Sequence, residues 1–204
     1  MATRDRYPGY HVLDQRGHWD EATRTVILDR VHNVPEFKHF DEHDQATLKA
    51  LCDRAIPQSD RALHERVPIA PWIDNFCQQD VLEGFRFDDM PPNATAWKWG
   101  LEGLDQTAHA LAGDDFAALD PHAQDRVLEE IRGGHPGGDV WRRMPARKWW
   151  TFVALRQITG VYYSHPLAWD EIGFGGPAYP RGYFALNHGE PEPWEVREAD
   201  RRRE

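Results

Sequence analysis

Residues 120–134, DPHAQDRVLEEIRGG, carry the clearest structural signal in the chain. Asp120 suits a helix N-cap because its carboxylate accepts hydrogen bonds from the free N–H groups of a first turn, and Pro121 suits the first helical position. The apolar residues that follow recur at helical spacing: Val127, Leu128 and Ile131. A Gly-Gly pair then ends the pattern. The stretch predicts an amphipathic helix with one buried face.

Upstream segments show the same period. Asp41 is a candidate N-cap with Asp44 three residues later, and the apolar stripe that follows stops at Pro57. Pro68 or Pro71 can open a helix that runs to about residue 83 and ends at Gly84. The apolar residues expected to be buried are Leu48, Leu51, Cys52, Ala55 and Ile56 in the first helix, and Ile69 or Ile73 with Phe76 and Cys77 in the second.

Three further segments favour helix. Residues 24–34 bring Val26, Ile27, Val31 and Val34 near one face, although their β-branched side chains leave a strand open. A second stripe ends at Gly113 and comprises Trp97, Leu101, Leu104, Ala108 and Leu111, although Gly100 and Gly103 lower its helix propensity. The last long helix is expected from Pro145 to Gly160, with Trp149, Phe152, Val153, Leu155 and Ile158 along it.

No segment alternates apolar and polar residues as a half-buried strand does, so we expect an all-α fold. The prediction is a single helical domain of five or six helices with a long irregular C-terminal arm. Its segments are an irregular N-terminal segment of residues 1–23, a helical core of residues 24–160, an arm of residues 161–195 packed on the core or on a partner, and a charged tail of residues 196–204.

The composition excludes several classes of function. The 34 acidic and 24 basic residues give a formal charge of −10, which disfavours nucleic acid as a partner. The mean hydropathy of −0.74 and the lack of a long apolar run argue against a transmembrane helix. The N-terminus has no apolar signal region, so we expect a cytoplasmic protein that becomes periplasmic only if a partner carries it.

Cysteines and tryptophans divide into core and surface candidates. The chain has only two cysteines, Cys52 and Cys77, and their apolar neighbours favour buried free thiols over a disulfide. Nine tryptophans are a heavy aromatic content for a hydrophilic chain. We expect Trp97 and Trp149 in the core, while the loop-borne Trp169 and Trp194 are interface candidates.

Residues 159–183, TGVYYSHPLAWDEIGFGGPAYPRGY, combine aromatic side chains with repeated glycine and proline. The pattern predicts a succession of turns instead of a helix. Irregular segments of this length in compact domains usually bind something, and aromatic rings and arginine dominate binding hot spots. An intramolecular stack remains the alternative for Arg181. The partner-interface candidates are Tyr162, Tyr163, His165, Trp169, Phe174, Tyr179, Arg181 and Tyr183.

Three motifs together resemble one protein family: YYSHPLAWDEIGFGGPAYPRGY at 162–183, YPGYHVLDQRGHWDEAT at 7–23 and VPIAPWID at 67–74. They are similar to the gluconate 2-dehydrogenase subunit 3 family over roughly residues 7–195. The resemblance implies a small subunit that accompanies a large flavin-dependent dehydrogenase of the glucose–methanol–choline type, often with a cytochrome c subunit. It implies FAD in the partner and no cofactor or catalytic residue in this chain.

Two histidine groups could hold a metal ion. His39 and His43 are four residues apart, but Asp41 as N-cap would place His39 before the helix. His165, Asp170, Glu171 and His188 could bind a divalent ion or perform acid–base chemistry. We favour a structural interpretation, in which a carboxylate satisfies backbone amides and His165 forms hydrogen bonds inside the arm.

The sequence therefore favours a non-catalytic accessory subunit that binds and stabilises a flavin-dependent gluconate or sugar dehydrogenase. One alternative is an independent metal-assisted enzyme that uses His165, Asp170 and His188. The other is a stand-alone structural or stress protein that retains the fold.

Overall fold

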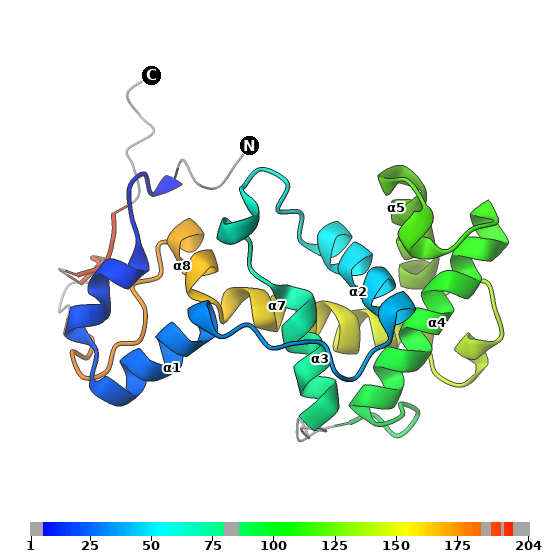
Figure 1. Cartoon of the computed structure of the whole chain (residues 1–204), viewed down its shortest axis with the longest axis horizontal. Helices are drawn as coiled ribbons and strands as arrows, with labels where there is room; N and C mark the ends of the chain where they lie inside the picture. Colours follow the sequence, from blue (N-terminus) through cyan, green and yellow to red (C-terminus); the bar gives the residue numbers. More distant parts are fainter. Residues whose placement is uncertain (1–5, 80–85, 185–188, 193, 198–204) are drawn as a thin grey trace. The chain divides into compact units, whose positions relative to one another are not determined.

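The computed structural model describes residues 6–79, 86–184, 189–192 and 194–197. Within these ranges every regular element is helical, which confirms the predicted all-α class (Figure 1). The described chain holds eight α-helices where five or six were expected. It also divides into two compact units instead of the single core that we predicted. Unit 1 comprises residues 1–34, 60–67 and 162–204, and unit 2 comprises residues 35–59 and 68–161.

Unit 2 is built around the long helix α4, Asn93–Ala112, which packs against α2 Glu42–Ala55, α3 Ile69–Gln79, α5 Pro121–Gly133 and the π-helical segment η6 Trp149–Leu155 (Figure 1). The unit also contains α6 Ala146–Lys148 and most of α7 Arg156–Tyr163. Two short 3₁₀ turns, η4 Phe116–Ala118 and η5 Val140–Arg142, also contact α4.

The predicted caps of unit 2 are confirmed. The carboxylate of Asp41 accepts a hydrogen bond from the Asp44 N–H at the start of α2. The carboxylate of Asp120 accepts hydrogen bonds from two N–H groups at the start of α5, and Pro121 lies in the first turn of that helix. Gly134 ends α5 in the left-handed conformation. The end predicted for α3, near residue 83, lies outside the described residues.

The apolar stripes predicted for unit 2 are buried at most positions. Trp97 and Trp149 are fully buried, as expected, and both cysteines are buried free thiols. Leu111 and Phe152 are about half exposed, because the stripes turn away from the core at these positions. The fully buried large side chains of unit 2 include Trp97, Trp149, Phe116, Leu48, Leu51, Ile73, Leu101, Leu104 and Ile131.

Two glycines in α4 have a packing role that their low helix propensity does not reveal. A Cβ at Gly100 would lie 2.0 Å from the indole ring of Trp149, and one at Gly103 would lie 2.4 Å from that of Trp141. Real Cβ atoms do not come that close to other heavy atoms. The glycines therefore admit two indole rings against the backbone of α4, and the packing gained outweighs the entropy lost.

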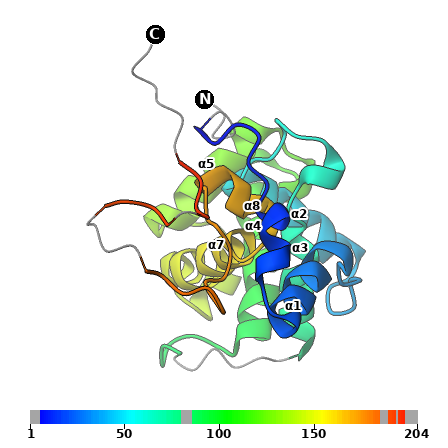
Figure 2. The same ribbon diagram turned by 90° about the vertical axis from the view of Figure 1, so that its left-hand side faces the viewer.

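Unit 1 contains the 3₁₀ segment η2 Val12–His18, α1 Glu21–His32, the turn η3 Leu63–Glu65, and α8 Pro166–Ile172 (Figure 2). Its core joins residues far apart in the sequence: Val12, Trp19, Ile27 and Trp169. The helix predicted at 24–34 exists but begins at Glu21, capped by Asp20. Of the face expected to be buried, Ile27 is buried, whereas Val26 and Val34 are exposed.

The prediction that residues 159–183 contain no helix is wrong. Helix α7 passes through Gly160 and ends at Tyr163, because the backbone hydrogen bonds continue where nothing crowds the glycine. Helix α8 follows, with His165 as N-cap and Pro166 in the first turn. From Gly173 to residue 184 the chain has no regular element. The tail predicted at 196–204 lies mostly outside the described residues.

Candidate functional site

Three of the eight interface candidates are buried inside unit 1. Tyr162 and His165 are each 3% exposed and Trp169 is 6% exposed. The indole N–H of Trp169 donates to the backbone carbonyl of Tyr163 at 2.8 Å, and its ring meets that of Phe174 edge to face. These three side chains hold unit 1 together and are not a surface for a partner.

Tyr162 belongs to a buried ionic network. Its hydroxyl donates to one oxygen of Glu171 at 2.7 Å, and the Arg61 guanidinium forms an ion pair with the other oxygen. The side chains of Arg61 and Glu171 are only 4% and 10% exposed. Burial, together with the negative Glu171 beside it, raises the pKa of Tyr162 well above its usual value. The network ties the residue 60–67 segment to helices α7 and α8.

His165 caps helix α8. Its Nδ1 accepts a hydrogen bond from the Leu167 N–H at 3.3 Å, and its Nε2 lies 3.1 Å from the backbone carbonyl of Arg30. Only neutral imidazole with the proton on Nε2 satisfies both contacts. Burial lowers the pKa of His165 to about 4. The hydrogen-bonded structural role that we favoured for His165 is confirmed.

The described members of the candidate group, His165, Asp170 and Glu171, do not gather around a common point where a metal could bind. Asp170 accepts a hydrogen bond from the Val12 N–H at 2.7 Å and contacts the ring of His11, while Glu171 belongs to the network with Arg61. His188 lies outside the described residues. Each described member of the group therefore has a separate structural partner.

The other interface candidates remain accessible. Tyr163, Phe174, Tyr179 and Tyr183 are 51%, 38%, 66% and 58% exposed, and Phe184 beside them is 73% exposed. In the described chain, the only other large aromatic side chain that is exposed is Phe152. Aromatic exposure is thus concentrated in residues 163–184 of unit 1.

Arg181 is held within unit 1 by an intramolecular stack. Its guanidinium lies 4.0 Å from the ring centroid of Trp194, and it donates to Gln15 and to the backbone carbonyl of Gly175. Tyr183 also contacts the Trp194 ring, at a centroid distance of 5.2 Å. The arginine therefore links Gly175 and Gln15 to Trp194, and Tyr179 and Tyr183 lie close to it in the sequence.

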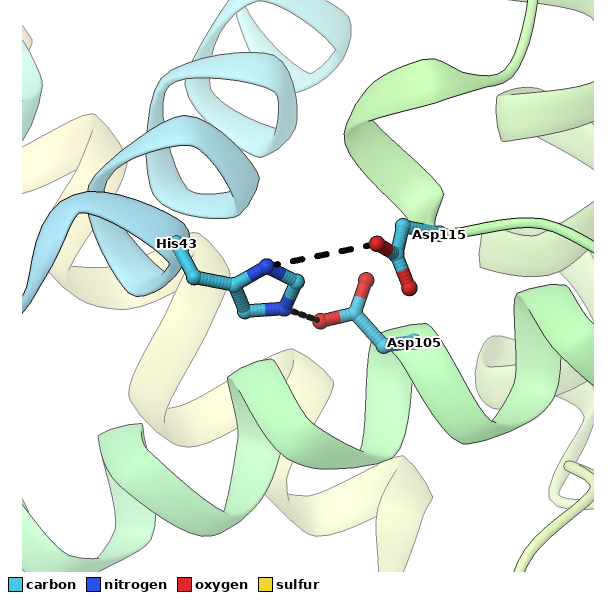
Figure 3. Close-up of side chains that lie close together, drawn as sticks. All are labelled: His43, Asp105 and Asp115. Carbon is cyan, nitrogen blue, oxygen red and sulfur yellow. Dashed lines mark hydrogen bonds and ion pairs between the residues drawn. The ribbon is translucent and has the colours of Figure 1, made fainter.

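A polar cluster in unit 2, shown in Figure 3, was not expected from the sequence. His43 from the first turn of α2 lies 2.9 Å through Nε2 from an oxygen of Asp105 on α4, and 4.0 Å through Nδ1 from an oxygen of Asp115. The hydrogen bond to Asp105, supported by the nearby carboxylates and opposed by burial, raises the pKa of His43. His39 precedes the helix, as the predicted N-cap at Asp41 implied.

A buried carboxylate positions this cluster. Asp74 on α3 is fully buried and accepts hydrogen bonds from the consecutive N–H groups of residues 38–40, which lead into α2. This fixes where α2 starts and hence where His43 lies. The sequence offered one signal of the cluster: Asp105 and His109 are four residues apart, which places both on one face of α4.

Unit 2 also has an open pocket of about 430 Å³ between α2 and α4. Its lining residues are His39, Asp44, Ala94, Thr95, Lys98, Trp99 and Glu102. The walls carry two carboxylates and one ammonium group, so their charge selects neither anions nor cations.

Comparison with models of known protein families assigns the chain to a family. The family model of gluconate 2-dehydrogenase subunit 3 matches residues 42–176, well over half of the 204 residues. The chain belongs to the gluconate 2-dehydrogenase subunit 3 family, named for one subunit of a dehydrogenase complex. The family model covers a shorter range than the resemblance, which extended over roughly residues 7–195. The matched range includes the motif at 67–74 and excludes the motif at 7–23. No curated protein and no solved structure gives a match.

None of the described helices combines the length and apolarity that crossing a membrane requires.

Proposed function

We propose that this chain is a non-catalytic accessory subunit that binds and stabilises the large, flavin-dependent subunit of a gluconate or sugar dehydrogenase of the glucose–methanol–choline type. Membership of the subunit 3 family supports this proposal. FAD would belong to the large subunit, and a cytochrome c subunit would be a further component of the complex.

One observation carries the proposal: five exposed aromatic rings fall within residues 163–184. Monomeric proteins bury most rings of this size, and exposed aromatics beside arginine are typical of protein–protein interfaces. The stack of Arg181 on Trp194 limits the conformations of this segment before binding, which lowers the entropy cost of association. We therefore assign the docking surface to Tyr163, Phe174, Tyr179, Tyr183 and Phe184.

The physical consequence of docking is stabilisation by mass action. A subunit that binds the folded flavoprotein but not its unfolded chain shifts the folding equilibrium toward the native, flavin-loaded state. Stabilisation of this kind needs no chemistry in the small subunit.

The test is co-expression of the large dehydrogenase of the same host with and without this chain. We expect more soluble large subunit and a higher flavin content per large subunit when the chain is present. Equal yield and equal flavin content in both cultures would reject the proposal. They would favour a stand-alone structural role instead.

A matched pair of variants locates the surface. Replacing both Tyr179 and Tyr183 with alanine should weaken association at least tenfold, since aromatic hot spots contribute about 2 kcal/mol or more each. Leu63→Ala is the control because Leu63 is 80% exposed in unit 1 but lies outside residues 163–184. Association unchanged in the tyrosine variant would move the docking surface elsewhere on the chain.

A further inference from the structure

The cluster in unit 2 contains the side chains of a metal site, drawn from three segments. His43 comes from the first turn of α2, Asp105 and His109 lie one turn apart on α4, and Asp115 follows that helix. His109 joins the cluster through its Nε2, which lies 2.7 Å from Oδ1 of Asp115. Two imidazoles and two carboxylates thus converge at the C-terminal end of α4.

Asp105 orients the imidazole of His43. One of its oxygens accepts from the Phe116 N–H at 2.9 Å, and the other lies 2.9 Å from His43 Nε2, with the Asp105 side chain only 13% exposed. A carboxylate held in this way keeps the His43 proton on Nε2, so that Nδ1 presents a lone pair. Metal-binding histidines typically have such a carboxylate on the nitrogen that does not bind the metal.

A gap separates the Nδ1 of His43 from the carboxylate of Asp115. This Nδ1 is 4.0 Å from Oδ2 of Asp115, too far for a hydrogen bond. Tetrahedral zinc with bonds of about 2.0–2.2 Å holds two ligand atoms about 3.4 Å apart, so a small movement of the exposed His43 and Asp115 side chains toward each other would let them bind one ion. His109 contacts the second oxygen of the same carboxylate, at 2.7 Å through its Nε2.

We propose that unit 2 binds one zinc-type divalent ion through His43 Nδ1, the carboxylate of Asp115 and His109, with Asp105 as a positioning residue. Two imidazoles and a carboxylate suit zinc and its neighbours among the transition metals better than magnesium or calcium, which prefer oxygen ligands. His43 and Asp115 are 56% and 43% exposed, so the ion has a path to the site and water completes its coordination. The bound ion fastens α2 to the end of α4.

The rival interpretation is an ion pair without metal, in which protonated His43 bridges the two aspartates. The raised pKa of His43 fits such a pair. The two interpretations differ in what they predict for zinc. A metal site gives saturable zinc binding and a melting temperature that rises with zinc, whereas an ion pair gives neither.

The experiment uses the full-length chain without an affinity tag, treated with a chelator and dialysed. Isothermal titration with zinc chloride above neutral pH should show one ion per chain, with magnesium and calcium chloride giving no saturable heat. His43→Ala and Asp115→Asn should each weaken zinc binding at least tenfold, whereas His122→Ala, at an exposed position on α5, should leave it unchanged. Circular dichroism of each variant checks that it is folded.

Three results would overturn the proposal. One is the absence of saturable zinc binding to the wild-type chain. The second is equal affinity in His43→Ala, Asp115→Asn and the His122→Ala control. The third is a melting temperature that depends on pH but not on zinc, which would assign the cluster to the ion pair. Because these measurements need no partner protein, their outcome is independent of the docking proposal.

Discussion

The two units differ in how many large aromatic side chains they expose: among the described residues, five in unit 1 and only Phe152 in unit 2. Unit 2 buries Trp97, Trp149 and Phe116 completely, whereas unit 1 leaves Tyr179 and Tyr183 more than half exposed. A helix core that buries its largest rings gains most of its stability from its own packing. Unit 1 has a smaller core and closes around a buried ionic network. The difference shows that unit 2 buries its largest rings in its own core, and it agrees with the proposed docking surface on unit 1.

The two units also differ in the environment of their histidines. Burial keeps His165 of unit 1 neutral by lowering its pKa to about 4, whereas the hydrogen bond to Asp105 raises the pKa of His43 in unit 2. Desolvation determines the direction of the pKa shift where the imidazole is enclosed, whereas the contact with a carboxylate determines it where the imidazole is half exposed. The units should therefore respond to pH in different windows.

The largest effect is expected at the ionic network of unit 1. Glu171→Gln removes the charge that pairs with buried Arg61, and breaking a buried pair from one side costs about 3 kcal/mol or more. Chemical denaturation should show this loss. Glu129→Gln is the matched control, because Glu129 pairs with Arg132 at the surface and should change stability by less than about 1 kcal/mol. Equal losses in both variants would contradict a network that holds unit 1 together.

Acid should destabilise unit 1 through His165. In the unfolded chain a histidine binds a proton below its ordinary pKa of about 6.5, whereas folded His165 resists protonation down to about pH 4. The unfolded state therefore binds more protons in this window, and stability falls as the pH is lowered through it, by up to about 3 kcal/mol.

The check compares wild type with His165→Asn, which keeps a side chain suited to an N-cap. Unfolding free energies measured from pH 7 down to pH 4 should converge for the two proteins as the pH falls, since the variant lacks the titrating group. His64→Asn, at an exposed position, serves as control. A difference between wild type and His165→Asn that stays constant with pH would show that the imidazole does not titrate as the structure implies.

Two helical glycines test the packing of unit 2. Gly100→Ala should cost about 1–3 kcal/mol, because the new Cβ collides with the Trp149 ring. Gly160→Ala should instead gain about 0.5–1 kcal/mol, because a Cβ there meets no atom within 4 Å. Thermal melts of both variants measure the two shifts. Shifts of the same sign would refute the close approach of Trp149 to α4.

The smallest stability effect is expected where unit 1 exposes its rings. Replacing both Tyr179 and Tyr183 with alanine should change the free energy of unfolding of the isolated chain by less than about 1 kcal/mol, since both side chains are more than half exposed. Urea denaturation of the chain alone measures this. A large loss would mean that these rings support unit 1 itself and are not reserved for a partner.

Much of unit 2 was predictable from the sequence because its signals are local. Asp41 and Asp120 act as caps within one turn, and the apolar spacing of the helices needs no long-range information. The burial of Trp97 and Trp149 followed from their places on such helices. The family was also recognisable from contiguous motifs, and its model matches residues 42–176.

The missed features depend on contacts between distant residues. Helix α8 was overlooked because glycine and proline around it suggested turns, whereas its cap is the unusual residue His165, which is also held by Arg30 in α1. The unit 2 cluster joins His43 to Asp105 and Asp115, more than 60 positions away in the sequence, so the spacing of Asp105 and His109 along α4 does not reveal that His43 lies beside them. Long-range pairing of this kind is the information that a single sequence lacks.

The central claim is that unit 1 docks a flavoprotein through residues 163–184. The most direct test is purification of the chain from its own host through a removable tag, followed by the visible absorbance spectrum of the eluate. We predict flavin absorbance with the wild-type chain and its loss when Tyr179 and Tyr183 are both alanine, while Leu63→Ala retains it. An eluate without flavin from the wild-type chain, or with equal flavin from both the wild type and the tyrosine variant, would contradict the claim.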